Sequence, residues 1–426
     1  MAGQAVGPAS FDQMFLFALS ILCLSVGALG IAWVLYQKRD AISWLGLFLL
    51  SAMAGLVAVV GPDPWLDDDI VRYLWDGYLQ SEGRLALTTS PLMEGTAAFP
   101  QSSYEILSYK WMPSVYPPLA QWVFGLLWTI FEADRQLWLL FFGLCSLGIQ
   151  GAIIRVGSLY NLPKHVVWLV VGHPIIIKEF WDSGHVDALG VFLVLVAMFW
   201  LKRSWSLPRG IFWGLAGLIK PLALVVFVLG PFSFKAKIKE GLPAGGVFLL
   251  GFWLYFDHWQ QFGYYLNTLG IFSREWIFNP GFAEAVHWLM GEGSFSDASW
   301  LTTTRFLSWM SIGLLVLGAT LQLIKRDPGW SLYFVGIFLV VQPVVNTWYL
   351  AWLLPYLVLA ERAQKRSLWF YLPWVLVSFG GFYSYSYWYQ FQDDVILRRI
   401  FWGASLGLLI GSCIGMKWNL TPKEKP

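Results

Sequence analysis

Long apolar runs separated by short polar stretches recur from one end of the chain to the other. An α-helix that crosses a bilayer needs about 20 mostly apolar residues, although several of these runs are shorter. The pattern predicts membrane-spanning helices and indicates no soluble domain and no repeat of fixed period. The candidate spans lie near residues 12–36, 42–61, 117–132, 136–158, 163–181, 186–201, 209–231, 241–257, 305–324, 330–346, 348–361, 367–387 and 396–416.

The predicted fold is all-α, a polytopic transmembrane helical bundle. About 11–13 membrane segments are expected from the length that a helix needs to cross a bilayer. We expect one integral membrane domain over residues 1–426. Its first outer loop covers residues 62–116 and should carry short amphipathic helices, and its second outer loop covers residues 258–304.

The positions of lysine and arginine predict the orientation, because cytoplasmic loops are enriched in both residues. Placing every basic loop in the cytoplasm puts the N-terminus and both outer loops on the other side of the membrane. The basic loops are Lys38-Arg39, Lys202-Arg203 with Arg209, Lys235 with Lys237 and Lys239, Lys325-Arg326, Arg362 with Lys365 and Arg366, and the tail from Lys417.

Two candidate spans conflict with that orientation. If residues 163–181 and 209–231 both cross fully, the basic loop at Lys202 lies outside. Each contains a proline, Pro174 or Pro221, and proline breaks the helical hydrogen-bond ladder. Re-entrant hairpins at both places resolve the conflict, and two kinked helices with one basic outer loop remain the alternative. The hairpins would bring three polar residues to the outer face, namely His185, Asp187 and Lys220.

Composition supports a membrane protein. Hydrophobic residues make up 57% of the chain, charged residues 13%, and the mean hydropathy is +0.58. That balance excludes an ordinary soluble enzyme. The net charge is only +2, and without a basic stripe we expect no nucleic-acid partner. The 27 Trp and 18 Tyr suit interfacial belts and a sugar-binding surface.

An acidic cluster follows the second candidate span. Carboxylates beside hydrocarbon are costly, so such a cluster predicts a functional site. Capping a helix would explain one aspartate but not three in a row. If a helix starts near Asp69, one of its faces carries Asp69 and Asp76, two acids that Arg72 can bridge. The candidate residues of this segment are Asp67, Asp68, Asp69, Arg72, Tyr73 and Asp76.

Two further polar segments are candidates. Tyr116 and Gln121 flank the prolines that open the next span, and they either line the mouth of a site or simply mark a helix start. Asp182, His185 and Asp187 precede another span and could hold acceptor hydroxyls or a divalent cation such as Mg or Mn. The spacing of these acids is not that of a known metal motif.

Lys220 is a lone lysine within an apolar span, which is costly unless it meets an anion or water. It either snorkels to the interface or binds a lipid phosphate, and we favour the phosphate. Trp348 and Tyr349 lie between two short spans. They could grip a polyprenyl chain or a sugar, or form part of an aromatic belt.

These segments together resemble the membrane glycosyltransferases of the C superfamily (GT-C). The nearest similarity is to the bacterial mannosyltransferase-like branch that uses polyprenyl-phosphate sugars, and the motifs cover most of residues 62–355. They are D-D-x-x-R-Y-L-W-D-G (68–77), Y-P-P-L-A-Q (116–121), G-H-V-D-A-L (184–189), G-L-A-x-L-x-K-P (214–221) and W-Y-L-A-W-x-L-P (348–355).

The resemblance implies that an acid of the first outer loop is the catalytic base, here Asp69 or its neighbour Asp68. It also implies that Lys220 lies near the donor phosphate, and that a hexose, with mannose favoured, passes to an envelope lipid, glycan or protein. The implied location is a bacterial inner membrane, with the site on the periplasmic face. The chain departs from relatives in residues 83–91 and in one additional early span.

The expected mechanism is a single displacement that inverts the anomeric carbon. The chain has no glycine-rich nucleotide cradle, so a donor anchored among the membrane lipids fits better. Lys220, helped by Arg274, would stabilise the leaving phosphate. Aromatic rings would stack on the acceptor, namely Trp111, Trp259, Tyr264, Tyr265 and Trp276. The alternatives are a transporter or flippase of lipid-linked sugars, and a polysaccharide polymerase or ligase.

Overall fold

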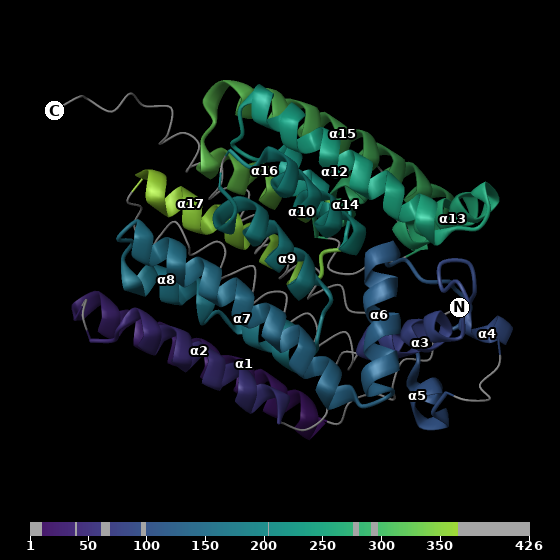
Figure 1. The fold of residues 1–426 in the computed structure, drawn as a ribbon, viewed down its shortest axis with the longest axis horizontal. Coiled ribbons are helices and arrows are strands. Elements are labelled where there is room, and N and C mark those ends of the chain that lie inside the picture. The colour runs from purple at the N-terminus through teal and green to yellow at the C-terminus, as the bar shows by residue number, and fades with distance from the viewer. Residues whose placement is uncertain are drawn as a thin grey trace. The chain divides into compact units, whose positions relative to one another are not determined.

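The computed structural model describes residues 11–38, 41–60, 69–94, 99–202, 204–275, 281–290 and 297–364. Within these ranges the chain is helical and contains no strand (Figure 1). The helices fall into two compact units. The first comprises Met1–Phe227 and Phe234–Phe272, and the second comprises Val228–Ser233 and Ser273–Pro426. The predicted all-α helical class is confirmed.

The helices of the first unit follow most of the predicted spans, and three short helices lie within residues 62–116, where short helices were expected. The elements are α1 (Phe11–Gln37), α2 (Trp44–Val59), α3 (Asp69–Ser81), α4 (Pro91–Glu94), α5 (Gln101–Ile106), α6 (Pro118–Phe131), α7 (Arg135–Leu159), α8 (Lys164–Val171), the π-helical η1 (Ile176–Asp182), α9 (Asp187–Leu195), the π-helical η2 (Val196–Trp200), α10 (Ser206–Ile219), α11 (Leu222–Val228), α12 (Phe234–Tyr255) and α13 (Trp259–Glu275).

In the second unit, polar side chains join a long helix, α15 (Asp297–Lys325), to the shorter antiparallel helix α16 (Pro328–Val340) and the residues that follow it. Gln322 donates to Ser331 Oγ at 2.9 Å, and Gln342 donates to Ser311 Oγ at 3.0 Å. Such hydrogen bonds hold helices together where water is absent. The other elements described here are α14 (Gly281–Leu289), the 3₁₀-helical η3 (Thr347–Leu353) and α17 (Leu354–Gln364).

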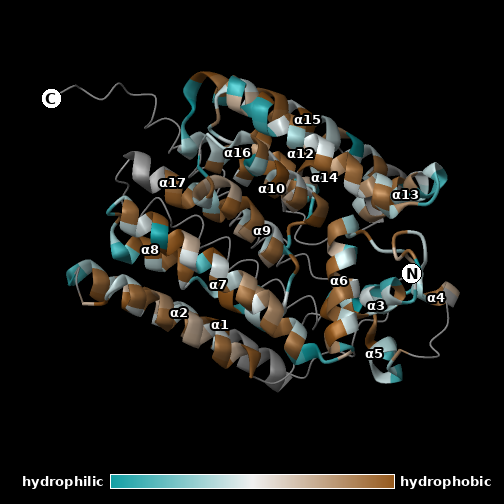
Figure 2. Ribbon diagram, in the orientation of Figure 1, coloured by the Kyte–Doolittle hydropathy of each residue, from teal (hydrophilic) through white to brown (hydrophobic). Residues whose placement is uncertain are grey.

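Three described helices are long and apolar enough to cross a membrane, namely Leu19–Gln37 of α1, Arg135–Leu159 of α7 and Trp300–Lys325 of α15. Apolar residues cover much of their length (Figure 2). Large side chains such as Trp33 and Trp309 are exposed on α1 and α15. Lipid removes the cost that water would impose on such surfaces.

Local signals set where several helices begin. Ser43 caps α2 by accepting a hydrogen bond from the Gly46 amide at 3.0 Å. Asp134 caps α7 in the same way, with the Leu137 amide 3.2 Å from its carboxylate. Pro118 occupies the first position of α6, where its missing N–H has no helical partner to lose.

Glycines allow α2 and α7 to pack as antiparallel neighbours. Gly157, near the end of α7, lies against Trp44 at the start of α2. Near the opposite ends of these helices, the fully buried Trp181 ring lies between Gly55 and Gly143. A Cβ on either of these glycines would come within 2.3 Å of the ring. Two residues without side chains therefore fix η1, which carries Trp181, against α2 and α7.

Cationic side chains lie on aromatic rings at one end of the first unit, which we call the basic end. Arg155 of α7 lies 6.0 Å from the Trp200 ring centre, and Lys164 of α8 lies 5.6 Å from that of Trp44. We call the opposite end the site end. It contains the start of α7 and the turn before α9, because Gly184 lies against Leu139.

The structure corrects the hairpin predicted for residues 163–181. Lys164 lies at the basic end, whereas Trp181 lies beside Gly143 towards the site end. The segment therefore runs the length of α7 in spite of the break at Pro174. α9 and η2 then return to the basic end, where Trp200 meets Arg155.

The course of residues 209–231 agrees with the predicted hairpin. Arg209 pairs with Glu240 at 2.8 Å, and further along the two helices Leu218 lies against Gly251, so α10 and α12 run parallel. α10 ends beside Lys220 at the site end, and α12 starts again at the basic end. Because α10 and α12 run in the same direction, the chain between them must return from the site end to the basic end. α11 lies in this returning segment.

The prediction that residues 117–132 span the membrane is wrong, because α6 lies across the site end (Figure 1). Phe124 packs on Trp138 in the first turn of α7, and Trp122 packs on Tyr255 at the end of α12. α6 has 14 residues, fewer than a full span needs. Without this span, the loop at Lys202 falls at the basic end and the conflict in orientation disappears.

Substituting Gly143 tests the packing of Trp181. Gly143→Ala should lower the free energy of unfolding by about 1–3 kcal/mol, because the new methyl group overlaps the indole ring. The matched control is Gly151→Ala in the same helix, where a Cβ meets Phe48 at an ordinary 3.6 Å. Thermal unfolding of both variants in detergent measures the difference. Equal midpoints for the two variants would contradict this packing.

Candidate functional site

α3 carries four polar side chains on one face, as predicted. Arg72, Tyr73 and Asp76 follow Asp69 by three, four and seven residues, which places them on the same face of an α-helix as Asp69. Tyr73 and Asp76 are completely buried. The Asp69 side chain is 25% exposed, so this carboxylate is the more accessible of the two acids.

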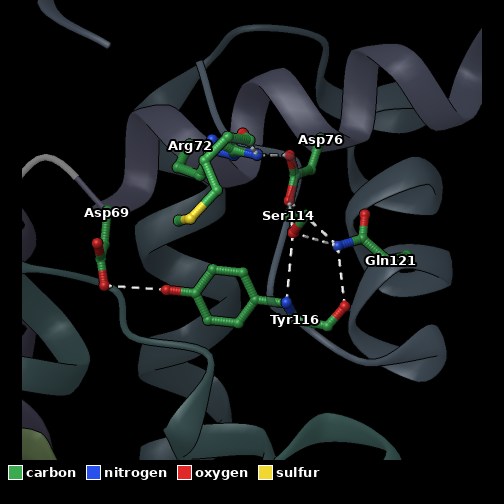
Figure 3. A network of polar contacts seen from close by, with 7 residues as sticks. Asp69, Arg72, Asp76, Ser114, Tyr116 and Gln121 are labelled. Atoms are coloured by element: carbon green, nitrogen blue, oxygen red, sulfur yellow. Dashed lines mark hydrogen bonds and ion pairs between the residues drawn. The ribbon is translucent and has the colours of Figure 1, made fainter. Parts of the chain in front are cut away.

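Asp69 meets groups from two distant segments. The Tyr116 hydroxyl donates a hydrogen bond to Asp69 Oδ2 at 3.0 Å (Figure 3). His185 Nδ1 lies 3.6 Å from the same oxygen and 3.5 Å from the Tyr73 hydroxyl. The Tyr73 ring stacks on Phe124 of α6 and meets the Tyr116 ring edge-on. Aromatic packing therefore holds the groups that surround the carboxylate.

Asp76 lies in a second polar group, the Asp76 cluster, which consists of Arg72, Asp76, Ser114 and Gln121. Arg72 Nε lies 2.9 Å from Asp76 Oδ1, and Gln121 Nε2 lies 3.1 Å from Oδ2. The Ser114 hydroxyl also donates to Oδ2. A buried carboxylate without such partners would cost several kcal/mol, so the cluster compensates for its burial.

Two expectations for this region need correction. Arg72 does not bridge Asp69 and Asp76 as predicted, because its guanidinium binds Asp76 and reaches the Met112 carbonyl at 3.0 Å instead. Gln121 does not line a mouth, since it is completely buried. It lies one turn into α6, and its amide faces the Asp76 cluster.

The segment before α6 is fixed at several points. The Ser114 amide donates to the Ala86 carbonyl at 2.8 Å, and the Tyr265 hydroxyl donates to the Val115 carbonyl at 3.2 Å. Burial raises the pKa of Tyr265, so its hydroxyl remains a neutral donor. The expectation that Tyr265 stacks on an acceptor is wrong, because the ring is enclosed in the hydrophobic core.

η1 and the turn after it supply the second group of polar residues. His185 Nε2 lies 3.1 Å from Glu179 Oε2, and both side chains are buried. Lys178 contacts the Ser183 hydroxyl and lies 3.3 Å from Asp182. The π-helical geometry of η1 is common at functional sites.

Gly184 makes the turn between η1 and α9 possible. Its φ of 69° lies in the left-handed region that other residues rarely adopt. A Cβ at this position would also come 2.7 Å from Leu139. The turn lets His185 face Asp69 and places Asp187 two residues later, at the start of α9.

Asp187 and Lys220 form a two-pronged ion pair. Lys220 Nζ lies 2.9 Å and 2.8 Å from the two carboxylate oxygens of Asp187, which is completely buried. Lys220 follows the last residue of α10, at the break that Pro221 introduces. The pair therefore connects the start of α9 to the end of α10.

Metal binding has no assembled site in the described ranges, where no three His, Cys, Asp or Glu side chains are grouped to hold an ion. Asp182 lies beside Lys178, and Asp187 lies beside Lys220. Asp67 and Asp68 lie outside the described residues.

Four of the predicted residues belong to the second unit, namely Arg274, Trp276, Trp348 and Tyr349. Trp348 is buried in η3 and meets the Tyr349 ring edge-on at 5.8 Å. Arg274 is in the last turn of α13, and its side chain lies outside the described residues, as does Trp276. The site geometry above comes entirely from the first unit and includes none of them.

Sequence reasoning missed three residues that the structure brings to these groups. Ser114 is an ordinary serine in a loop, and only its contact with Asp76 marks it. Glu179 and Lys178 fall within a predicted span, and a carboxylate inside an apolar segment was the available signal for Glu179. The pairing of Glu179 with His185 depends on the turn at Gly184, which local periodicity does not reveal.

Comparison with known families identifies the class of protein. The sequence model of glycosyltransferase family 87, a GT-C type family, matches residues 115–343. The match covers more than half of the 426 residues. The chain belongs to glycosyltransferase family 87. It is therefore a membrane glycosyltransferase, and GT-C membership agrees with the resemblance found in the motifs.

The family match includes Tyr116, His185, Asp187 and Lys220, whereas Asp69 lies before its first residue. No curated protein sequence matches this family 87 chain. No solved structure matches it either.

Removing one partner tests the ion pair between α9 and α10. Lys220→Met leaves the buried Asp187 without this cation and should destabilise the protein by about 3–5 kcal/mol. Adding Asp187→Leu to that variant should recover most of the loss, because no buried charge remains. The control Lys202→Met, at an exposed position, should change stability by less than about 0.5 kcal/mol. Thermal unfolding in detergent measures all three, and an unchanged Lys220→Met protein would contradict the pairing.

Proposed function

We propose that this family 87 protein transfers a hexose, with mannose as the favoured sugar, from a polyprenyl-phosphate donor to a lipid, glycan or protein of the cell envelope. The observation that supports this most directly is the environment of Asp69. This partly exposed carboxylate at the site end touches Tyr116 and His185. It lies in the same unit as the Lys220–Asp187 pair.

The proposed reaction is one inverting displacement. Asp69 accepts the proton of the acceptor hydroxyl as that oxygen attacks the anomeric carbon of the donor sugar. The bond between the anomeric carbon and the phosphate oxygen breaks, and polyprenyl phosphate leaves with its electron pair. A positioned base contributes about 10²–10⁴-fold to such a step. Asp68 is the alternative base, and it lies outside the described residues.

Lys220 is the proposed cation for the leaving phosphate. The two contacts with Asp187 hold the ammonium group in one position at the end of α10. A fixed cation stabilises charge that develops on the phosphate more effectively than a mobile one, because it needs no reorganisation during the reaction. Arg274 remains a proposed second cation.

The distribution of charge supports an active site on the outer, periplasmic face. Arg155, Lys164 and Lys202 lie at the basic end, and cytoplasmic surfaces are the ones enriched in such residues. Asp69, His185 and Asp187 lie at the opposite end. A donor whose lipid chain lies in the bilayer can present its phosphate there, so a cytoplasmic nucleotide-sugar site is not required. The motif resemblance makes a bacterial inner membrane the proposed location.

Exposed aromatic rings offer surfaces for the acceptor. Trp259 and Tyr264 of α13 are 80% and 64% exposed, and Trp111 in the first outer loop is 47% exposed. Sugar rings stack on such faces through their C–H groups, while their hydroxyls remain in water. These three residues are the proposed acceptor platform. Trp348 and Tyr349 are the residues proposed to contact the donor sugar or its polyprenyl chain.

Replacing Asp69 tests the proposed base. Asp69→Asn removes the proton acceptor but keeps the shape, so transfer should fall by about 10²–10⁴-fold. The purified protein is incubated with polyprenyl-phosphate mannose or polyprenyl-phosphate glucose and with membrane lipid extract. Release of free polyprenyl phosphate and formation of glycosylated product are measured.

The outcomes of that assay separate the alternatives. The wild type should release polyprenyl phosphate and glycosylate a lipid, with mannose preferred over glucose. Movement of intact donor across a vesicle membrane without release would favour a flippase. A folded Asp69→Asn protein with full transfer would remove Asp69 as the base, and comparable unfolding temperatures establish that the variant is folded.

A further inference from the structure

Asp76 is too enclosed to contact a substrate. Its side chain has no exposed surface, and both carboxylate oxygens are occupied within the protein. Arg72 binds Oδ1, whereas Ser114 and Gln121 bind Oδ2. The predicted role of Asp76 in substrate binding therefore does not fit its surroundings, and a different role must account for a charged group at this position.

The partners of Asp76 all hold the segment that leads to Tyr116. Ser114 Oγ accepts a hydrogen bond from the Tyr116 amide at 3.3 Å, and Gln121 Nε2 donates to the Tyr116 carbonyl at 3.1 Å. Arg72 donates to the Met112 carbonyl at 3.0 Å. Ser114 and Gln121, the two neutral partners of Asp76, thus form hydrogen bonds with the peptide groups on both sides of the Tyr116 side chain.

Tyr116 extends from this cluster to Asp69. Figure 3 shows its backbone beside Ser114 and Gln121, with its hydroxyl at the other end pointing to Asp69. The hydroxyl is 3.0 Å from Asp69 Oδ2. Asp69 and Asp76 lie on one face of α3, two helical turns apart. Tyr116 connects the accessible acid to the buried one along that face.

We propose that Asp76 is a positioning residue that orients Asp69 through Tyr116. The inference rests on the proposed function, because it assigns Asp69 the role of base. The Asp76 cluster fixes the Tyr116 backbone, the phenol hydroxyl binds Oδ2, and this bond sets the direction in which the carboxylate faces the acceptor. Asp76 itself touches neither donor nor acceptor.

This arrangement predicts an effect on the rate of transfer rather than on substrate affinity. Losing one hydrogen bond to the charged Asp69 should lower kcat by about tenfold or more, with KM nearly unchanged. Tyr116→Phe removes that bond directly. Asp76→Asn and Ser114→Ala remove it indirectly, because they loosen the backbone from which Tyr116 extends.

A double-mutant cycle tests whether Asp76 acts through Tyr116. The kcat of Asp76→Asn, Tyr116→Phe and the double variant are compared in the transfer assay. When two residues act as one unit, the effects of substituting them do not add. The kcat of the double variant should therefore be no lower than that of the slower single variant. The proposal would be overturned if the fold-losses in kcat of the two single variants multiplied in the double variant, or if the variants changed KM alone. If Asp76→Asn does not fold, Ser114→Ala takes its place in the cycle.

Amide hydrogen exchange over residues 112–117 provides a readout that needs no turnover. Asp76→Asn or Ser114→Ala should accelerate exchange there by about tenfold, because opening becomes easier when the cluster is broken. The control is Ser81→Ala at the exposed end of α3, where the hydroxyl bonds only locally to the Tyr78 carbonyl. It should alter neither exchange nor kcat. Unchanged exchange in both cluster variants would overturn the inference, whereas a wild type without transfer activity would overturn the proposed function instead.

Discussion

Charges enclosed by apolar helices must be paired, and this requirement shapes the first unit. Asp76 is paired with Arg72 beneath α6, Asp187 with Lys220 between α9 and α10, and Glu240 with Arg209 between α10 and α12. An unpaired charge at any of these places would cost several kcal/mol. The first pair lies within α3, whereas the other two join different helices and therefore specify that α9 and α12 are neighbours of α10.

Two of these pairs, Asp76–Arg72 and Asp187–Lys220, lie at the site end. The Lys220–Asp187 pair closes the hairpin of α10 and α11 at the level where α9 begins. Two residues before Asp187, His185 lies between Glu179 and Asp69. The segment that follows Gly184 thus contacts Asp69 of α3 through His185 and Lys220 through Asp187. The proposed displacement uses Asp69 as the base and Lys220 as the cation, and one short segment connects the two.

Periodicity and residue chemistry predicted much of this arrangement. Apolar runs predicted α1, α2, α7, α12 and α15, and helical spacing predicted the polar face of α3. The proline at position 221 predicted the break at Lys220. These features depend on residues that are close in sequence, which is why a single sequence reveals them.

Features that depend on distant contacts were not predictable. α6 is apolar enough to resemble a span, and only its packing on α3 and on the first turn of α7 shows that it lies across the bundle. The residues from 163 to 181 contain a proline but still run beside α7, because Trp181 fits between two glycines. Ser114 and Gln121 gain their roles from Asp76, which is 38 and 45 residues away.

The most direct test is a structure of the full chain in lipid with a bound polyprenyl-phosphonate sugar, a donor analogue whose carbon–phosphorus bond resists cleavage. The account predicts that the phosphonate lies beside Lys220 and that the anomeric carbon faces Asp69. The space between the anomeric carbon and the Asp69 carboxylate should hold one acceptor hydroxyl. A headgroup bound at the basic end, or an anomeric carbon turned away from Asp69, would contradict it.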